Sequence, residues 1–118
     1  MNLSRYIMFA GYNAWANERL YNAASRLSDA EYRADRGAFF KSIHGTLNHL
    51  LAADRIWMKR FTGQGEAPAK LDAILHEEFA NLRAARDRED ARISAFVGQL
   101  TEAELAANFS YMTIVNPK

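Results

Sequence analysis

The sequence predicts a single all-α domain over residues 1–118, a helical bundle with long helices at about 3–27, 38–61 and 71–100. Apolar residues recur three and four positions apart through each segment, which is the period of a helix that packs on one side. Residues that favour turns separate the segments, and the chain has the length of one domain. The three helices should therefore pack together through their apolar faces.

The first helix is predicted from an apolar stripe that starts at Leu3 and fades near Leu27. The stripe consists of Leu3, Ile7, Ala10, Ala14, Tyr21 and Ala24. Asn17 falls on the same stripe, and we interpret it as a hydrogen-bonding group between helices rather than a substrate contact. Tyr12 and Trp15 also lie at helical spacing and are predicted to belong to the core.

The second helix carries large apolar residues on one stripe and ends at a glycine-rich turn after Phe61. The stripe consists of Ile43, Leu47, Leu50, Trp57 and Phe61, and its two aromatic residues are predicted to be core. Asp54 lies on the same side, where a structural ion pair with Arg55 or Arg19 is favoured over a catalytic role. Asn48 is interpreted, like Asn17, as a hydrogen-bonding group between helices.

The third helix is predicted from about Leu71 to Leu100. Its apolar side consists of Leu71, Leu75, Phe79, Leu82, Ile93, Phe96, Val97 and Leu100. Charges alternate in sign between Arg83 and Arg92, and a solvated, ion-paired face is favoured there over a basic patch for DNA. Residues 108–115 are aromatic and β-branched without a helical period, which predicts an extended tail.

A short sequence pattern occurs after both the first and the third predicted helix. Leu27–Asp35 and Leu100–Asn108 each open with Ser/Thr-x-x-Glu, the pattern of a helix capping box. Either both helix exits use the same favourable cap, or the chain repeats a helix–turn–helix unit. A repeat would place a fourth helix after Lys118, so we expect that a partner covers an open apolar face or that the sequence is an incomplete gene product, and we favour the second. An exposed apolar groove and self-association of these 118 residues are then expected.

Composition excludes several classes of function. The chain contains no cysteine, which excludes a disulfide framework, a zinc ribbon or a thiol nucleophile of its own. Its formal net charge of +1 offers no bulk attraction for nucleic acid or an anionic membrane, so we expect neither as a partner. No apolar run approaches the roughly 20 residues of a membrane span, and a cytoplasmic location is expected.

Three histidines are the only candidate borderline-soft metal ligands: His44, His49 and His76. His44 and His49 are five positions apart, which separates them by about 140° around a helix, so they cannot bind one ion from one straight helix. From the residues alone, each of the three is more often a packed or exposed histidine than a ligand. No glycine-rich phosphate loop, nucleophile elbow or paired-carboxylate motif is present.

Three stretches in order resemble the DinB-like (YfiT-like) metalloprotein family: Tyr12–Asn17, Leu27-Ser28 and Ile43–Trp57. The resemblance implies an up-down-down-up four-helix bundle, of which three long helices and the tail are present here. It further implies a dimer and a divalent metal, nickel or zinc, held by three histidines. His49, in an Asn-His-Leu-Leu segment, matches one ligand. The other two come from a His-x-x-x-His pair on the last helix, which this sequence does not contain.

Two classes of function follow from this resemblance. The first is a metal-dependent enzyme that acts on a small-molecule substrate in stress response or detoxification. It either transfers a low-molecular-weight thiol to that substrate or hydrolyses the substrate. Bacillithiol, mycothiol and glutathione are the thiols that relatives use. The second is a non-catalytic dimeric helical binding or scaffold protein whose metal site is incomplete in this chain. An inactive fragment of the enzyme is a third, simpler alternative.

Overall fold

The computed structural model describes residues 3–37, 40–70, 72–101 and 103–104. The regular elements in this part of the chain are the helices α1 (Leu3–Ala24), α2 (Asp29–Arg33), α3 (Ile43–Thr62) and α4 (Phe79–Gln99). The prediction of an all-α helical bundle is confirmed. None of these helices combines the length and the apolarity that a membrane span requires.

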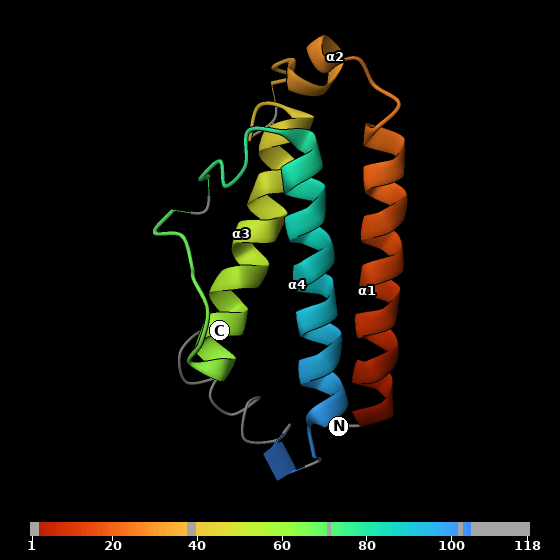
Figure 1. Cartoon of the computed structure of the whole chain (residues 1–118), viewed down its shortest axis with the longest axis vertical. Helices are drawn as coiled ribbons and strands as arrows, with labels where there is room; N and C mark the ends of the chain where they lie inside the picture. Colours follow the sequence, from red (N-terminus) through yellow and green to blue (C-terminus); the bar gives the residue numbers. More distant parts are fainter. Residues whose placement is uncertain (1–2, 38–39, 71, 102, 105–118) are drawn as a thin grey trace.

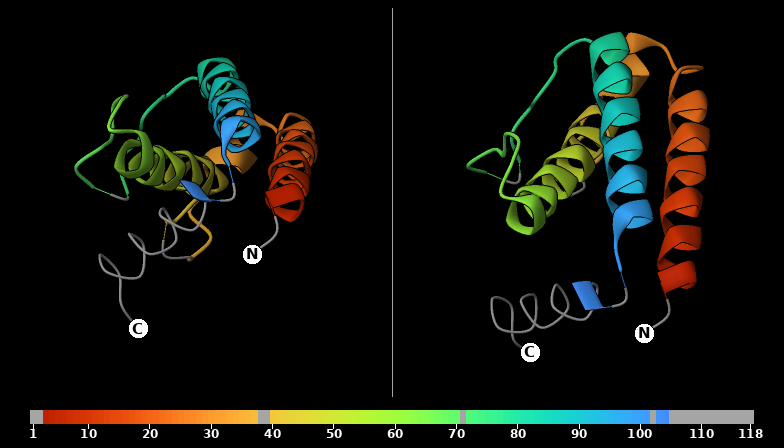
Figure 2. Two further views of the ribbon diagram at one scale, coloured as in Figure 1. Left: turned by 90° about the horizontal axis from the view of Figure 1, so that it is seen from below. Right: turned by 60° about the horizontal axis from the view of Figure 1, so that its bottom comes forward.

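The three long helices lie side by side, with α4 between α1 and α3 (Figures 1 and 2). Helix α1 runs in one direction along the long axis, and both α3 and α4 run in the opposite direction (Figure 1). Helix α2 crosses the end of the bundle where α1 stops and α3 starts. The parallel pair α3 and α4 requires a long return connection, and residues 63–70 and 72–78 supply it along the outer side of α3.

The first helix ends at Ala24, slightly before the predicted end, and the capping box after it is confirmed. The Ser28 amide donates to the Glu31 carboxylate at 2.9 Å, and the Glu31 amide donates to the Ser28 hydroxyl at 3.1 Å. These bonds satisfy exposed amides at the start of α2. Thr101 and Glu104 make the same reciprocal pair at 3.0 and 3.1 Å, so both copies of the sequence pattern act as caps. The predicted tail, 108–115, lies outside the described residues.

The second helix begins at Ile43 rather than near residue 38, because Ser42 caps it. The Ser42 hydroxyl accepts from the Gly45 amide at 2.9 Å, and the preceding Lys41 has a left-handed backbone with φ of 70°. The chain folds so closely over this first turn that a Cβ on Gly45 would lie 2.1 Å from the Phe40 carbonyl oxygen. Gly63, at φ of 70°, ends the helix with the left-handed conformation that glycine favours.

The third long helix begins at Phe79, so the predicted start near residue 71 is wrong. Residues 72–78 are irregular, although Leu75 continues the apolar spacing. The side-chain oxygen of Asn48 accepts from the backbone amides of Leu75 and His76 at 2.8 and 3.1 Å. These bonds to α3 replace the bonds that a helix would make within the segment.

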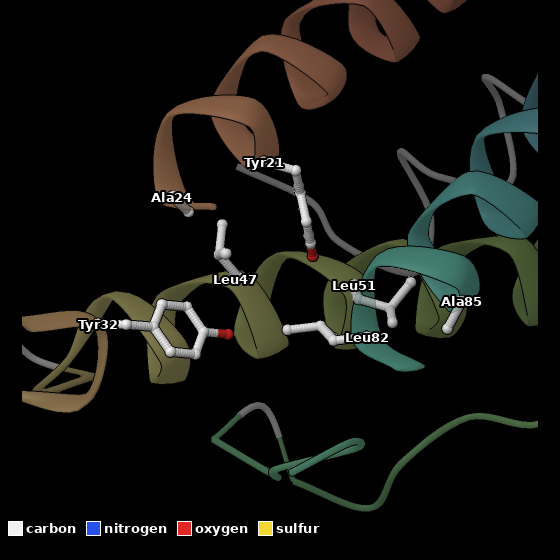
Figure 3. Packing of buried hydrophobic residues seen from close by; sticks show 7 residues of the cluster. All are labelled: Tyr21, Ala24, Tyr32, Leu47, Leu51, Leu82 and Ala85. Carbon is white, nitrogen blue, oxygen red and sulfur yellow. The ribbon is translucent and has the colours of Figure 1, made fainter. Parts of the chain in front are cut away.

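The core lies at the end of the bundle that α2 covers, where all four helices contribute side chains (Figure 3). Its buried members are Tyr21, Ala24, Tyr32, Leu47, Leu51, Leu82 and Ala85. Tyr12 and Trp15 were predicted to join the core, but 63% and 52% of their surfaces are exposed. They contact each other on the exposed surface of α1, because Ala10, Tyr21 and Ala24 take the inward side.

Candidate functional site

His49, the predicted metal ligand, lies half-buried on α3. Its imidazole stacks on the ring of Phe40, with 3.8 Å between ring centroids and 17° between planes. Leu47 and Leu51, two positions before and after His49, are in the core, so helical geometry directs His49 roughly 160° away from each of them. The hydrophobic core therefore does not enclose this imidazole.

His44 occupies a different environment on the same helix. It is only 5% exposed, and its Nδ1 atom lies 2.7 Å from the Tyr32 hydroxyl. Its Nε2 atom has no hydrogen-bond partner and lies 3.7 Å from a carboxylate oxygen of Glu77. Burial lowers the pKa of His44, Arg33 lowers it further, and Glu77 opposes both effects. The two histidines of α3 do not converge on one point, as their spacing predicted.

His76 lies in the irregular segment before α4, where its backbone groups bind the buried side chain of Asn48. Asn48 accepts from the His76 amide, and its amide group donates to the backbone oxygens of His44 at 3.0 Å and His76 at 3.4 Å. Asn48 was predicted to bond between helices. Its role is structural, but its partner outside α3 is this segment and not another helix.

The described residues do not fit a complete metal centre. Among them, no three histidine, aspartate or glutamate side chains gather closely enough to hold an ion. His49 therefore does not belong to a set of three such side chains within the described ranges. A three-histidine site cannot form from these residues, and no catalytic step through a metal follows from their arrangement.

A buried ion network was missed by the sequence analysis. Arg86, only 1% exposed, contacts the Asp54 carboxylate of α3 at 2.6 Å and the Asp90 carboxylate of its own helix at 2.7 Å. The Asn17 amide of α1 donates to Asp90 at 3.1 Å. The predicted partners of Asp54, Arg55 and Arg19, are replaced by Arg86 because α4 packs between α1 and α3. Asn17 does bond between helices, as predicted.

The stretch from Arg83 to Arg92 is therefore only partly the solvated face that was predicted. Arg86, Glu89 and Asp90 are buried, while Asp87 and Arg88 are exposed. The signal was present in the spacing, because Arg86 and Asp90 follow the core residue Leu82 at intervals of four. Because the charges alternate along the sequence, they do not indicate that the buried side of the helix continues from Leu82 through Arg86 and Asp90.

The environment explains how these charges are kept inside the bundle. Burial disfavours the charged form of Arg86, but Asp54 and Asp90 outweigh it and raise the pKa of the guanidinium. Burial raises the pKa of Asp90, and Arg86 and Asn17 partly offset this effect by bonding to the carboxylate. Three helices thus meet on one permanently charged arginine, an arrangement that serves structure.

A shallow groove of about 350 Å³ lies between α1 and α4, beside this network. Its lining residues are Ala14, Trp15, Glu18, Asp87, Asp90, Ala91 and Ser94. None of them belongs to α3, so the groove and His49 do not form one site.

Comparison with known proteins agrees with the resemblance. A family model described as DinB family matches residues 1–114. Protein DinB of Bacillus subtilis (strain 168) is 28% identical over 79 residues, which cover 67% of this chain and 46% of that protein. The matched part thus spans about half the length of the curated relative. No solved structure matches the chain. Because the family model covers nearly every residue, the chain belongs to the DinB family.

Proposed function

We propose that the chain forms part of a DinB-family metalloenzyme and that His49 supplies one imidazole to a divalent ion, nickel or zinc. The remaining ligands come from outside the described residues. The reaction class is transfer of a low-molecular-weight thiol to a small-molecule substrate, or hydrolysis of that substrate. A homodimer and a role in stress response remain predictions from the same family resemblance. A cytoplasmic location remains a prediction from the sequence.

The observation that carries this proposal is the position of His49. It occupies the Asn-His-Leu-Leu segment that matches the family, and it lies half-buried on the side of α3 opposite the core leucines. An imidazole at such a place can meet ligands from a further helix without unpacking the core. His44, by contrast, is enclosed and its Nδ1 atom is engaged with Tyr32.

The test begins with the gene sequence after the codon for Lys118. A His-x-x-x-His pair on an amphipathic helix there would support the enzyme, and a stop codon would favour the scaffold alternative. The protein from the complete reading frame is then purified as wild type, His49→Ala and His76→Ala, and its metal content is measured by mass spectrometry. We expect His49→Ala to lose nearly all bound metal, because about 10–100-fold in affinity is lost even when an outer-shell partner is removed.

His76→Ala is the matched control, because the backbone of His76, and not its ring, holds the irregular segment. It should retain the wild-type metal content. Unchanged metal in His49→Ala would remove His49 from the site and overturn the proposal. Equal losses in both variants would point to a general folding defect, which circular dichroism of the same samples would reveal.

The alternative, a dimeric helical scaffold, draws on the exposed apolar residues of α1. Five large apolar side chains of this helix are exposed between its second and fourth turns: Ile7, Met8, Phe9, Tyr12 and Trp15. Exposed apolar surface of this kind commonly marks an interaction site. Sedimentation of the 118-residue chain tests this alternative, since Tyr12→Glu should shift a dimer toward monomer. A wild-type monomer at all concentrations would contradict it.

A further inference from the structure

The surroundings of His44 have a property that the metal proposal does not use. Among the described residues, His44 Nε2 is one of two buried side-chain atoms with no hydrogen-bond partner, and the other is the Tyr21 hydroxyl. Four residues surround this nitrogen and its ring, and we call them with His44 the His44 cluster: Asp29, Tyr32, Arg33 and Glu77. We propose that this cluster is an acid-sensitive latch, which releases residues 72–78 from α2 and α3 when His44 binds a proton.

The cluster joins three parts of the chain that are separate in sequence. Tyr32 and Arg33 belong to α2, His44 lies in the first turn of α3, and Glu77 precedes α4. Arg33 donates to the Glu77 carboxylate at 3.3 Å and also to its backbone oxygen. Asp29 holds the same guanidinium at 2.9 Å. Glu77 is therefore one point where the irregular segment attaches to the end of the bundle.

The partners determine which ring nitrogen of neutral His44 carries the proton. Glu77 can only accept, so the nitrogen facing it, Nε2, is the protonated one. Nδ1 then accepts from Tyr32, whose pKa is raised by burial to about 12, so that its hydroxyl keeps its proton. At 3.7 Å, Nε2 and the Glu77 oxygen are too far apart for a hydrogen bond.

A second proton on His44 disturbs this arrangement. Nδ1 becomes a donor, and the Tyr32 hydroxyl must turn to accept from it. The new positive charge is enclosed by protein and lies near the guanidinium of Arg33, while Glu77 and Asp29 provide only partial compensation. Protonation is therefore more favourable when the segment has moved away and water reaches the ring.

The sign of the pH dependence follows from this difference. Burial, and then Arg33, lowers the pKa of His44 below its ordinary value of 6.5 in the closed state. The open state therefore binds more protons than the closed state as the pH falls below 6.5. The free energy that favours the closed latch over the open one is greatest above pH 6.5 and decreases as the pH falls below that value. It stops decreasing once the pH is below the closed-state pKa of His44.

Apart from the His44 cluster, the segment is attached through Asn48 and through packing of Leu75 against the hydrophobic core. Asn48, one turn after His44 on α3, accepts from the amides of Leu75 and His76. Glu78 at the start of α4 makes no side-chain capping bond, so the start of that helix depends on the neighbouring attachments. Opening of the His44 cluster should therefore be visible as faster exchange at the Leu75 and His76 amides.

Hydrogen exchange of the 118-residue chain, followed by NMR from about pH 7.5 to about pH 5, tests this inference without any metal. Protection factors are used because they correct for the intrinsic pH dependence of exchange. We expect protection of the Leu75 and His76 amides to fall as the pH drops below 6.5 and the His44 ring titrates, because protonation favours the open state. Amides in the middle of α1 should not change.

Three variants distinguish the latch from general acid destabilisation. His44→Gln should remove the pH dependence of protection at both amides, and His49→Gln, on the same helix, should retain it. If His44→Gln fails to fold, Glu77→Gln serves instead, because the Glu77 side chain is largely exposed. Removing its charge should move the His44 titration to lower pH. Constant protection while His44 titrates, or an unchanged titration in Glu77→Gln, would overturn the inference, whatever His49 does with a metal.

Discussion

Two buried polar clusters hold this bundle together, and they differ in how fully their groups are paired. Arg86 contacts two carboxylates, and Asn17 binds one of them in turn. In the His44 cluster one ring nitrogen has no hydrogen-bond partner. A buried charge that is fully paired stays charged and holds its neighbours, whereas a buried titratable group with a free nitrogen changes its interactions when it binds a proton.

The clusters also differ in what they join. The Arg86 network connects side chains of three long helices, whose own backbone bonds are already satisfied. The His44 cluster connects two helices to an irregular segment, which relies on side chains for its attachment. Loss of a contact should therefore weaken the whole bundle in the first case and loosen one segment in the second.

The largest expected effect comes from breaking the fully paired cluster. Arg86→Met removes the cation and leaves the buried Asp90 and the partly exposed Asp54 without their main partner. We expect the free energy of unfolding to fall by about 3–5 kcal/mol, as for other broken buried ion pairs. Urea denaturation measures this change. Arg88→Met, exposed on the same helix, is the matched control and should stay within about 0.5 kcal/mol of wild type. A stable Arg86→Met protein would show that the network is dispensable.

A smaller effect is expected at the attachment of the irregular segment. Asn48→Ala leaves the backbone amides of Leu75 and His76 without their acceptor. The expected loss is about 2 kcal/mol, since an unsatisfied buried group costs about 1–3 kcal/mol and this segment can partly reach water. Thermal unfolding gives the stability, and exchange at the two amides shows whether the loss is local. Slow exchange at both amides in Asn48→Ala would contradict this role.

The smallest expected effects concern two buried tyrosine hydroxyls: that of Tyr32 in the His44 cluster and that of Tyr21 near Arg86. Tyr32→Phe removes the hydroxyl that bonds to His44 and should cost about 1 kcal/mol. The Tyr21 hydroxyl is buried near Arg86 but has no hydrogen-bond partner, so Tyr21→Phe should be neutral or stabilising. Parallel urea titrations measure both changes. Equal destabilisation by the two substitutions would mean that Tyr21 has a partner in solution, such as a bound water.

The parts of the fold that the sequence could predict are those set by neighbouring residues. The capping box of Ser28 and Glu31 and its second copy at Thr101 and Glu104 were predicted from spacing alone. The start of α4 was not, because Asn48 is 27 positions from Leu75 and takes the amide that a longer helix would use. Local sequence patterns do not reveal a hydrogen-bond acceptor that another helix supplies.

Only part of the candidate site could be predicted from the sequence. The divergence of His44 and His49 followed from helical geometry, and the structure places the two rings in separate environments. The burial of Arg86 could not be read from an alternation of charges that is typical of an exposed helix. The burial of Arg86 depends on α4 lying between α1 and α3, and the sequence of α4 alone does not specify that order of helices.

By itself, the sequence determined the all-α class, the helix caps and the family to which the chain belongs, because each depends on residue type and short spacing. Only the tertiary structure decided which charges are buried and which aromatic residues face solvent. The physical reason is that burial depends on what packs against a side chain. A pattern of alternating basic and acidic residues looks the same in a helix that faces water and in one that lies between two other helices.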